Sequence, residues 1–332
     1  MLINKLRYLL PFMVAITLSC NKSDTNTSIT TPTSPSTPTT DDAVVIEVDP
    51  TNFIAAGLTE SITKVSQTLA DGSTVMCYRI VSNNTPSDHA QGPWCPTNIN
   101  DGIDKGGIWF EGGKLYDVDG PFIKNLATFY SNTTWKLYNS TTGTINVTDT
   151  KAACEAAARP NVDPLYKNYC VQCLPSYFPG IKKIYYIPVK PVKSNNTTPI
   201  MGMGGVVGIA FNGINFDPPA PTQAILGAYT LAPFDDAGGH VNGATGYHYH
   251  AATGKSTKIK QTDAHAAMIG YAMDGYGLFE NLDEAGKEST DLDASRGHYD
   301  SIRGYHYHVA NAGSNSFINS FRGVPGSFSV TL

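Results

Sequence analysis

GYHYH occurs twice in this chain, at Gly246–His250 and at Gly304–His308. Successive side chains of a β-strand point to opposite faces, so a strand of this sequence would carry its histidines on one face and its tyrosines on the other. The alternation therefore predicts two strands with the tyrosines packed in the core behind the histidines. Together the two strands would supply four imidazoles: His248, His250, His306 and His308.

The other histidines gather around the same motif. Seven of the eight lie between residues 240 and 308, and only His89 lies apart. His240 and His298 each stand eight residues before the first histidine of a GYHYH copy, and His265 lies between the copies. We expect the two strands and these additional histidines to converge on one site.

The sequences before the two copies differ. DDAGGHVNGAT precedes the first and DLDASRGHYDSIR precedes the second. Because they share little beyond the upstream histidine, we do not interpret the two copies as a duplicated unit.

A cluster of imidazoles indicates a transition-metal site. Nitrogen donors favour copper, zinc or nickel over magnesium or calcium, and the Irving–Williams order places copper above zinc. Asp235, Asp236 and Asp274 are candidates to hold the second ring nitrogen of each histidine. Asp274 is also the catalytic candidate if the metal site is enzymatic. Two alternatives remain: an ordinary amphipathic strand with hydrogen-bonded histidines, and a pH-sensitive histidine patch.

The remaining sequence favours a mainly β fold, either a β-sandwich or a distorted barrel-like arrangement, with a few short helices and long loops. Short runs rich in β-branched and aromatic residues predict strands, and an Asn-Gly pair within FNGINF predicts a hairpin. These runs are Thr74–Ser82, Lys114–Val118, Lys182–Val189 and Gly204–Phe216. Helices are predicted over Asp149–Arg159, capped by Thr150, and over Gly120–Tyr130. The acidic stretch Glu280–Asp300 lacks the pattern of a calcium-binding loop and is predicted to be a solvated loop.

The N-terminus predicts export. Residues 1–19 combine two basic residues with a short apolar run, as in a secretory signal peptide, and Cys20 stands where a bacterial lipoprotein would be cleaved and lipidated. Residues 20–42 are rich in Ser, Thr and Pro, which predicts a disordered tether. The expected location is the outer membrane or cell surface, with the membrane contacted through the lipid anchor. An ordinary secreted protein is the alternative.

Charge and cysteine content narrow the protein class. A formal net charge of −5 over 332 residues offers no basic surface, so we expect no nucleic-acid partner. Five cysteines follow Cys20, and outside the cytoplasm two structural disulfides with one thiol left over are expected. The sequence does not choose their pairing: Cys77, Cys95, Cys154, Cys170 and Cys173.

Several motifs together resemble the YHYH-domain family, whose members are mostly of unassigned function. They are GIAFNGINFDPPAP, DDAGGHVNGATGYHYHA, IGYAMDGYGLFE, DLDASRGHYD and GYHYHV, with RIVSNNTPSDHAQGPW as an earlier match. The resemblance implies one domain over residues 43–332 with an atypical insertion at about 109–177, and it adds His89 to the histidine set. Relatives often carry cysteine where this chain has Ala237 and Ser295, which implies a lost disulfide beside the cluster.

Three functions follow as alternatives. The first is an envelope lipoprotein that binds a transition metal, copper before zinc, through His248, His250, His306 and His308, with His240 next and then His298, His265 and His89. The second is a metal-dependent hydrolase or oxidase that uses the same cluster. The third is a surface recognition or adhesion module in which the Tyr/His strands are scaffold.

Overall fold

The computed structural model describes residues 44–157, 161–200 and 205–331. The predicted signal peptide, Cys20 and the tether to residue 42 lie outside these residues. The described residues form one compact unit. Within the described residues, no helix has the length and apolar character needed to cross a bilayer.

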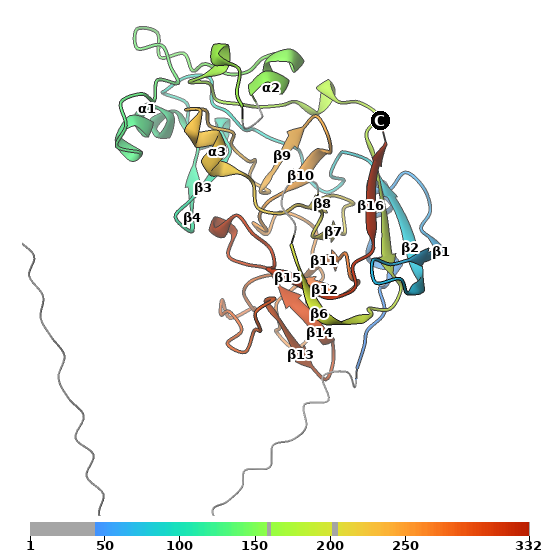
Figure 1. The fold of residues 1–332 in the computed structure, drawn as a ribbon. Helices are drawn as coiled ribbons and strands as arrows, with labels where there is room; N and C mark the ends of the chain where they lie inside the picture. Colours follow the sequence, from blue (N-terminus) through green and yellow to red (C-terminus); the bar gives the residue numbers. More distant parts are fainter. Residues whose placement is uncertain (1–43, 158–160, 201–204, 332) are drawn as a thin grey trace, which may run out of the picture. The chain divides into compact units, whose positions relative to one another are not determined.

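The fold is mainly β, as predicted, with three short α-helices in the part of the chain that is described (Figure 1). The strands are β1 Thr63–Thr68, β2 Thr74–Ser82, β3 Ile108–Glu111, β4 Lys114–Asp117, β5 Lys182–Pro188, β6 Lys193–Pro199, β7 Gly208–Ala210, β8 Asn215–Phe216, β9 Gly239–Asn242, β10 Gly246–Tyr249, β11 Met268–Ala272, β12 Gly277–Phe279, β13 Gly297–Asp300, β14 Gly304–His308, β15 Ser320–Gly323 and β16 Ser327–Thr331. The helices are α1 Gly120–Phe129, α2 Lys151–Ala157 and α3 Thr222–Gly227.

Two sheets share the main hydrophobic core. One has four antiparallel strands in the order β1-β2-β5-β16, and the other has eight in the order β13-β14-β12-β11-β7-β8-β10-β9. Ile80 and Ile187 of the smaller sheet belong to the same buried cluster as Phe216, Tyr247 and Tyr307 of the larger one. The tyrosines of both GYHYH strands are therefore core residues, as their alternation predicts.

The eight-stranded sheet consists of two halves with the same pairing. β7 and β11 meet antiparallel at its centre. Outward from them, β8 pairs in parallel with β10, and β12 pairs in parallel with β14. The outermost strands β9 and β13 complete an antiparallel hairpin with β10 and β14. The order is thus the same read outward in either direction, which is a pseudo-two-fold arrangement.

The halves also match residue by residue in their turns. A shift of 58 residues brings Gly246 into register with Gly304, and both have positive φ, +69° and +62°. The same shift relates Asp235 to Asp293, and Oδ1 of each carboxylate accepts from two backbone N–H groups of the turn that follows. The interpretation that the two copies are not a duplicated unit is therefore wrong. The segments before the two copies share their turn geometry, although few of their residues are identical.

Residues between β2 and β5 form most of a second, smaller core, which Ala220, Leu231, Phe234 and Ala251 complete. Both predicted helices are present there: Asp119 caps α1 and Thr150 caps α2 through hydrogen bonds to backbone N–H groups. Two disulfides join Cys95 to Cys170 and Cys154 to Cys173, and Cys77 is a buried free thiol. The expectation of two disulfides and one thiol is confirmed. In Figure 1 these segments lie near the β9–β10 end of the large sheet, away from β13 and β14.

Candidate metal centres

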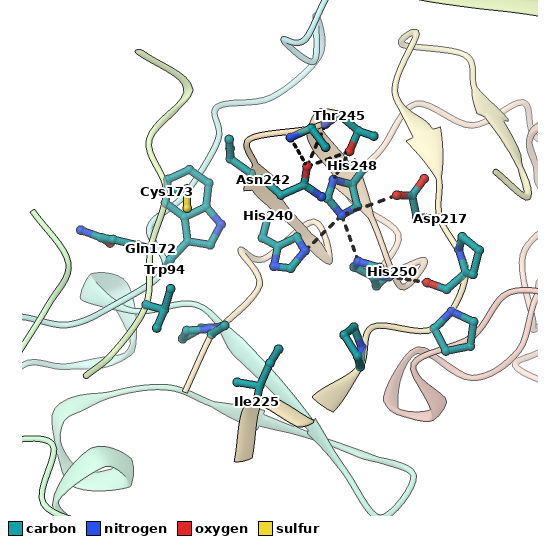
Figure 2. Close-up of a pocket in the computed structure, with 18 of the residues that line it drawn as sticks. Trp94, Gln172, Cys173, Asp217, Ile225, His240, Asn242, Thr245, His248 and His250 are labelled. Carbon is teal, nitrogen blue, oxygen red and sulfur yellow. Dashed lines mark hydrogen bonds and ion pairs between the residues drawn. The ribbon is translucent and has the colours of Figure 1, made fainter. Parts of the chain in front are cut away.

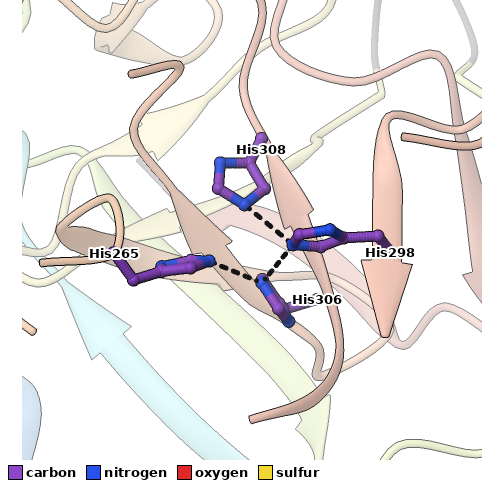
Figure 3. A group of neighbouring side chains, drawn as sticks. All are labelled: His265, His298, His306 and His308. Atoms are coloured by element: carbon purple, nitrogen blue, oxygen red, sulfur yellow. Dashed lines mark hydrogen bonds between the residues drawn. The ribbon is translucent and has the colours of Figure 1, made fainter. Parts of the chain in front are cut away.

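The first cluster, called here the four-histidine site, comprises His265, His298, His306 and His308 (Figure 3). His306 and His308 project from the same face of β14, and His298 pairs directly with His306 across the β13–β14 hairpin. The Nε2 atoms are 2.9 Å apart between His298 and His306, 3.2 Å between His298 and His308, and 3.1 Å between His265 and His306.

The second cluster, the three-histidine site, comprises His240, His248 and His250 (Figure 2). It repeats the hairpin geometry: His248 and His250 share one face of the β10 strand and its end, and His240 pairs with His248 across the hairpin. The Nε2 atom of His248 lies 3.1 Å from Nε2 of His240 and 3.1 Å from Nε2 of His250.

Backbone carbonyls set the tautomer of most of these rings. Nδ1 of His248 and of His306 lies 2.9 Å and 3.0 Å from the carbonyl oxygen of Gly246 and Gly304. Nδ1 atoms of His250, His265 and His308 likewise meet carbonyl oxygens of Pro218, Ala266 and Glu280, and Nδ1 of His298 meets the Asp291 carboxylate. A carbonyl or carboxylate oxygen only accepts, so Nδ1 carries the proton in each ring.

The Nε2 atoms of these six rings therefore carry unprotonated lone pairs, and they point towards the other histidines of their cluster. Neutral rings held in this tautomer cannot form hydrogen bonds between Nε2 atoms, and contacts near 3 Å are then repulsive unless a cation lies among them. Tetrahedral zinc–imidazole bonds of about 2.0–2.1 Å place ligand nitrogens about 3.3 Å apart, close to the spacings seen here. The donor sets fit a metal ion in chemistry and in size.

A proton competes with a metal ion for the imidazole nitrogens, and burial lowers the affinity of these rings for the proton. Burial lowers the pKa of His250 to about 4 and that of His308 to about 4. It also holds the pKa of His240 and His248 well below the usual value. These four imidazoles are thus neutral near pH 7, which is the form that binds metals.

The expectation that both GYHYH strands converge on one site is wrong. β10 and β14 lie in the same sheet, but the two hairpins β7–β8 and β11–β12 separate them. Each strand instead combines with its own upstream histidine. His265 lies close only to the second strand, in the loop that precedes β11.

The carboxylates expected behind the histidines lie elsewhere. Asp235 accepts a hydrogen bond from the Tyr247 hydroxyl and Asp274 accepts one from the Tyr307 hydroxyl, both on the tyrosine face. Asp236 forms an ion pair with Lys255. Asp274 is fully buried on the face opposite the histidines, so the structure gives it a structural contact and no access to a ligand.

His89 is not in either cluster. Its Nδ1 lies 2.7 Å from the Asp88 carboxylate, and its Nε2 lies 3.4 Å and 3.3 Å from the hydroxyls of Tyr247 and Tyr249. It therefore contacts the back of the three-histidine site. The resemblance alone suggested it as a ligand.

Two acidic neighbours and a buried lysine were missed at the sequence level. Asp217 places Oδ2 3.6 Å from Nε2 of His248, and Asp291 supports His298. The Lys183 ammonium is fully buried and donates to the Tyr247 carbonyl of β10 and to Asn215. Burial raises the pKa of Asp217 and lowers that of Lys183, and their mutual attraction opposes both shifts. The lysine stands within a strand run, where nothing marks it as buried.

These features define a β-rich protein with two histidine centres related by internal duplication. The family model described as YHYH protein matches residues 184–286, which confirms the resemblance carried by the motifs. The matched segment includes the first GYHYH copy, and the second copy lies beyond it. No curated protein and no solved structure matches the chain.

The duplication also corrects an implication of that resemblance. Ala237 and Ser295 are equivalent positions in the two halves, next to β9 and β13 at opposite ends of the eight-stranded sheet. A disulfide joining them is therefore excluded. Ala237 packs in the main core, and the Ser295 hydroxyl lies 2.6 Å from that of Ser320.

Proposed function

We propose that this protein binds two transition-metal ions, one at each histidine cluster. The observation that carries the proposal is the convergence of Nε2 atoms in each cluster. Six of the seven are unprotonated, because the Nδ1 atoms of their rings face oxygen acceptors. A hairpin that places two histidines on one strand opposite a third is present twice, and in each copy burial disfavours protonation of the two GYHYH histidines.

Copper is the metal we favour, with zinc as its competitor. All-nitrogen sites bind copper(II) more tightly than the other divalent metals of the first transition row. An envelope protein meets this competition directly, because it lies outside the cytoplasmic metal buffers.

We place the protein outside the cytoplasm, anchored by a lipid on Cys20 to the outer membrane or cell surface. Two disulfides support an oxidising compartment. The N-terminal sequence supports the anchor. The function in that setting is capture or delivery of the metal.

Metal titration of chelator-treated protein tests the proposal. We expect two ions per chain, one lost in His248→Gln, one lost in His306→Gln and both lost in the double variant. Asp236→Asn, which breaks only a surface ion pair, is the control and should retain both ions. Absence of saturable binding at micromolar copper and zinc would exclude the proposal, as would binding that the histidine variants do not change.

A further inference from the structure

We propose that the three-histidine site binds a small, largely apolar molecule that carries one hydroxyl group, with the hydroxyl oxygen on the metal. This inference rests on the proposed metal binding and assigns a ligand class to one of the two centres. The two centres differ in ligand number and in surroundings, and the difference points to separate roles.

A cavity of about 280 Å³ opens next to the three histidines (Figure 2). Its walls are mainly apolar and come from distant parts of the chain: Trp94, Val171, Ile225, Ala232, Val241 and Phe328. Small-molecule sites are typically lined by such side chains, with a few polar groups that orient the ligand. Burial of an apolar body here is therefore favourable.

The polar end of the cavity is the metal centre itself. His240, His248 and His250 all line the cavity. Three imidazoles leave one position of a tetrahedral metal open, as catalytic and ligand-binding zinc sites do. In the four-histidine site, His265 supplies a fourth imidazole, so that centre has a complete ligand set.

Asp217 determines which donor group of a ligand is favoured at the metal. Its Oδ2 lies 3.6 Å from His248 Nε2, and its Oδ1 accepts a hydrogen bond from the Asn215 side-chain amide. Oδ2 is thus left facing the metal position, where it can accept a hydrogen bond from a hydroxyl bound to the metal. A carboxylate ligand would have no proton to donate to Oδ2.

The volume limits the size of the ligand. Cavities for drug-sized molecules span about 300–1,000 Å³, and this one lies just below that range. A single-ring phenol fits the combination of a compact apolar body with one hydroxyl.

Cobalt(II) absorption reports coordination at this centre. In His306→Gln protein loaded with cobalt, which retains only the three-histidine site, 4-methylphenol should change the visible spectrum saturably. Toluene, which lacks a donor, should leave the spectrum unchanged, and 4-methylbenzoate should bind about tenfold more weakly or worse. The matched His248→Gln protein, which retains only the four-histidine site, should not respond to 4-methylphenol.

Two substitutions test the cavity and the carboxylate separately. Ala232→Phe should fill the cavity and weaken 4-methylphenol binding by about tenfold or more, and Ile225→Phe serves if the first variant does not fold. Asp217→Asn should reduce the preference for 4-methylphenol over 4-methylbenzoate. Bound cobalt without a response to 4-methylphenol, or an equal response in the His248→Gln protein, would overturn the inference alone. Failure of cobalt to bind would overturn the proposed function.

Discussion

At the scale of single residues, the second tyrosine of each GYHYH strand places its hydroxyl against the turn of a neighbouring hairpin, on the face of the sheet opposite the histidines. The Tyr307 hydroxyl donates to the buried Asp274 carboxylate at 2.6 Å and accepts from the Arg322 backbone N–H at 2.7 Å. In the other half, the Tyr249 hydroxyl accepts from the Asn212 amide at 2.7 Å. The same position therefore meets a carboxylate in one half and a neutral amide in the other.

Tyr307→Phe should lower the free energy of unfolding of the metal-free protein by about 1–3 kcal/mol, since it removes a hydrogen-bond donor from a buried carboxylate. Tyr249→Phe is the matched control and should cost about 1 kcal/mol, because the amide keeps its bond to Asp88. Denaturant unfolding measures both. Equal losses would contradict the role given to the Asp274 carboxylate, and a change in metal stoichiometry would contradict the assignment of these tyrosines to the core.

The buried imidazoles predict a pH dependence for the metal-free protein. Burial lowers the pKa of His250 and His308 to about 4, whereas unfolded histidine titrates near 6.5. Between these values the unfolded chain binds more protons, so stability is present above about pH 6.5 and falls as the pH drops towards about 4. Each histidine contributes a slope of about 1.4 kcal/mol per pH unit.

Guanidinium unfolding at several pH values, with chelator present, checks this dependence. His250→Gln should reduce the slope of stability against pH by the contribution of one histidine, about 1.4 kcal/mol per pH unit. A stability that is flat between pH 6.5 and 4.5 would show that the metal-free clusters are solvated.

At the scale of elements, the glycine that opens each GYHYH strand also supplies the carbonyl that binds the histidine Nδ1. A Cβ on Gly304 would lie 2.3 Å from the Val44 carbonyl oxygen, and the positive φ strains any L-residue there. Gly304→Ala should therefore displace the acceptor and weaken metal binding at the four-histidine site, leaving the three-histidine site unchanged.

Gly286→Ala is the control for backbone strain. Gly286 also has a positive φ, +73°, but a Cβ there would meet no atom within 4 Å. It should cost about 1 kcal/mol of stability and leave the metal affinity of both sites unchanged. Calorimetric titration with zinc distinguishes the variants, and equal effects on metal affinity would disprove the role given to the Gly304 carbonyl.

Local sequence pattern predicts the elements and which faces they bury, but not which elements meet. The Tyr/His alternation indicates the strand faces because that period is local. The position of β10 relative to β14 depends on hairpins inserted between them in the sheet, which is a non-local pairing. The carbonyl partners of Nδ1 could not be predicted either, since any residue type can supply a backbone oxygen.

At the scale of the whole molecule, the segment between β2 and β5 forms part of one metal centre's surroundings. Cys173 and Val171 line the cavity of the three-histidine site, and both disulfides hold this stretch to the rest of its core. The four-histidine site lies at the other end of the large sheet.

Loss of the Cys95–Cys170 disulfide, which closes a loop over 75 residues, should cost about 2–5 kcal/mol of stability. In Cys95→Ser/Cys170→Ser protein, metal and ligand affinity should fall at the three-histidine site and persist at the four-histidine site. Cobalt spectra of each single-site background measure the two separately. Equal weakening of both centres would show that the cavity wall does not act locally.

The pseudo-two-fold sheet has a consequence for how the two centres can change. In a dimer of identical half-length chains, symmetry would place every substitution at both centres at once. Here both halves belong to one polypeptide, so a mutation alters one centre and leaves its twin untouched. That independence allows the four-histidine site to have four imidazoles while the three-histidine site has three imidazoles and a cavity beside them.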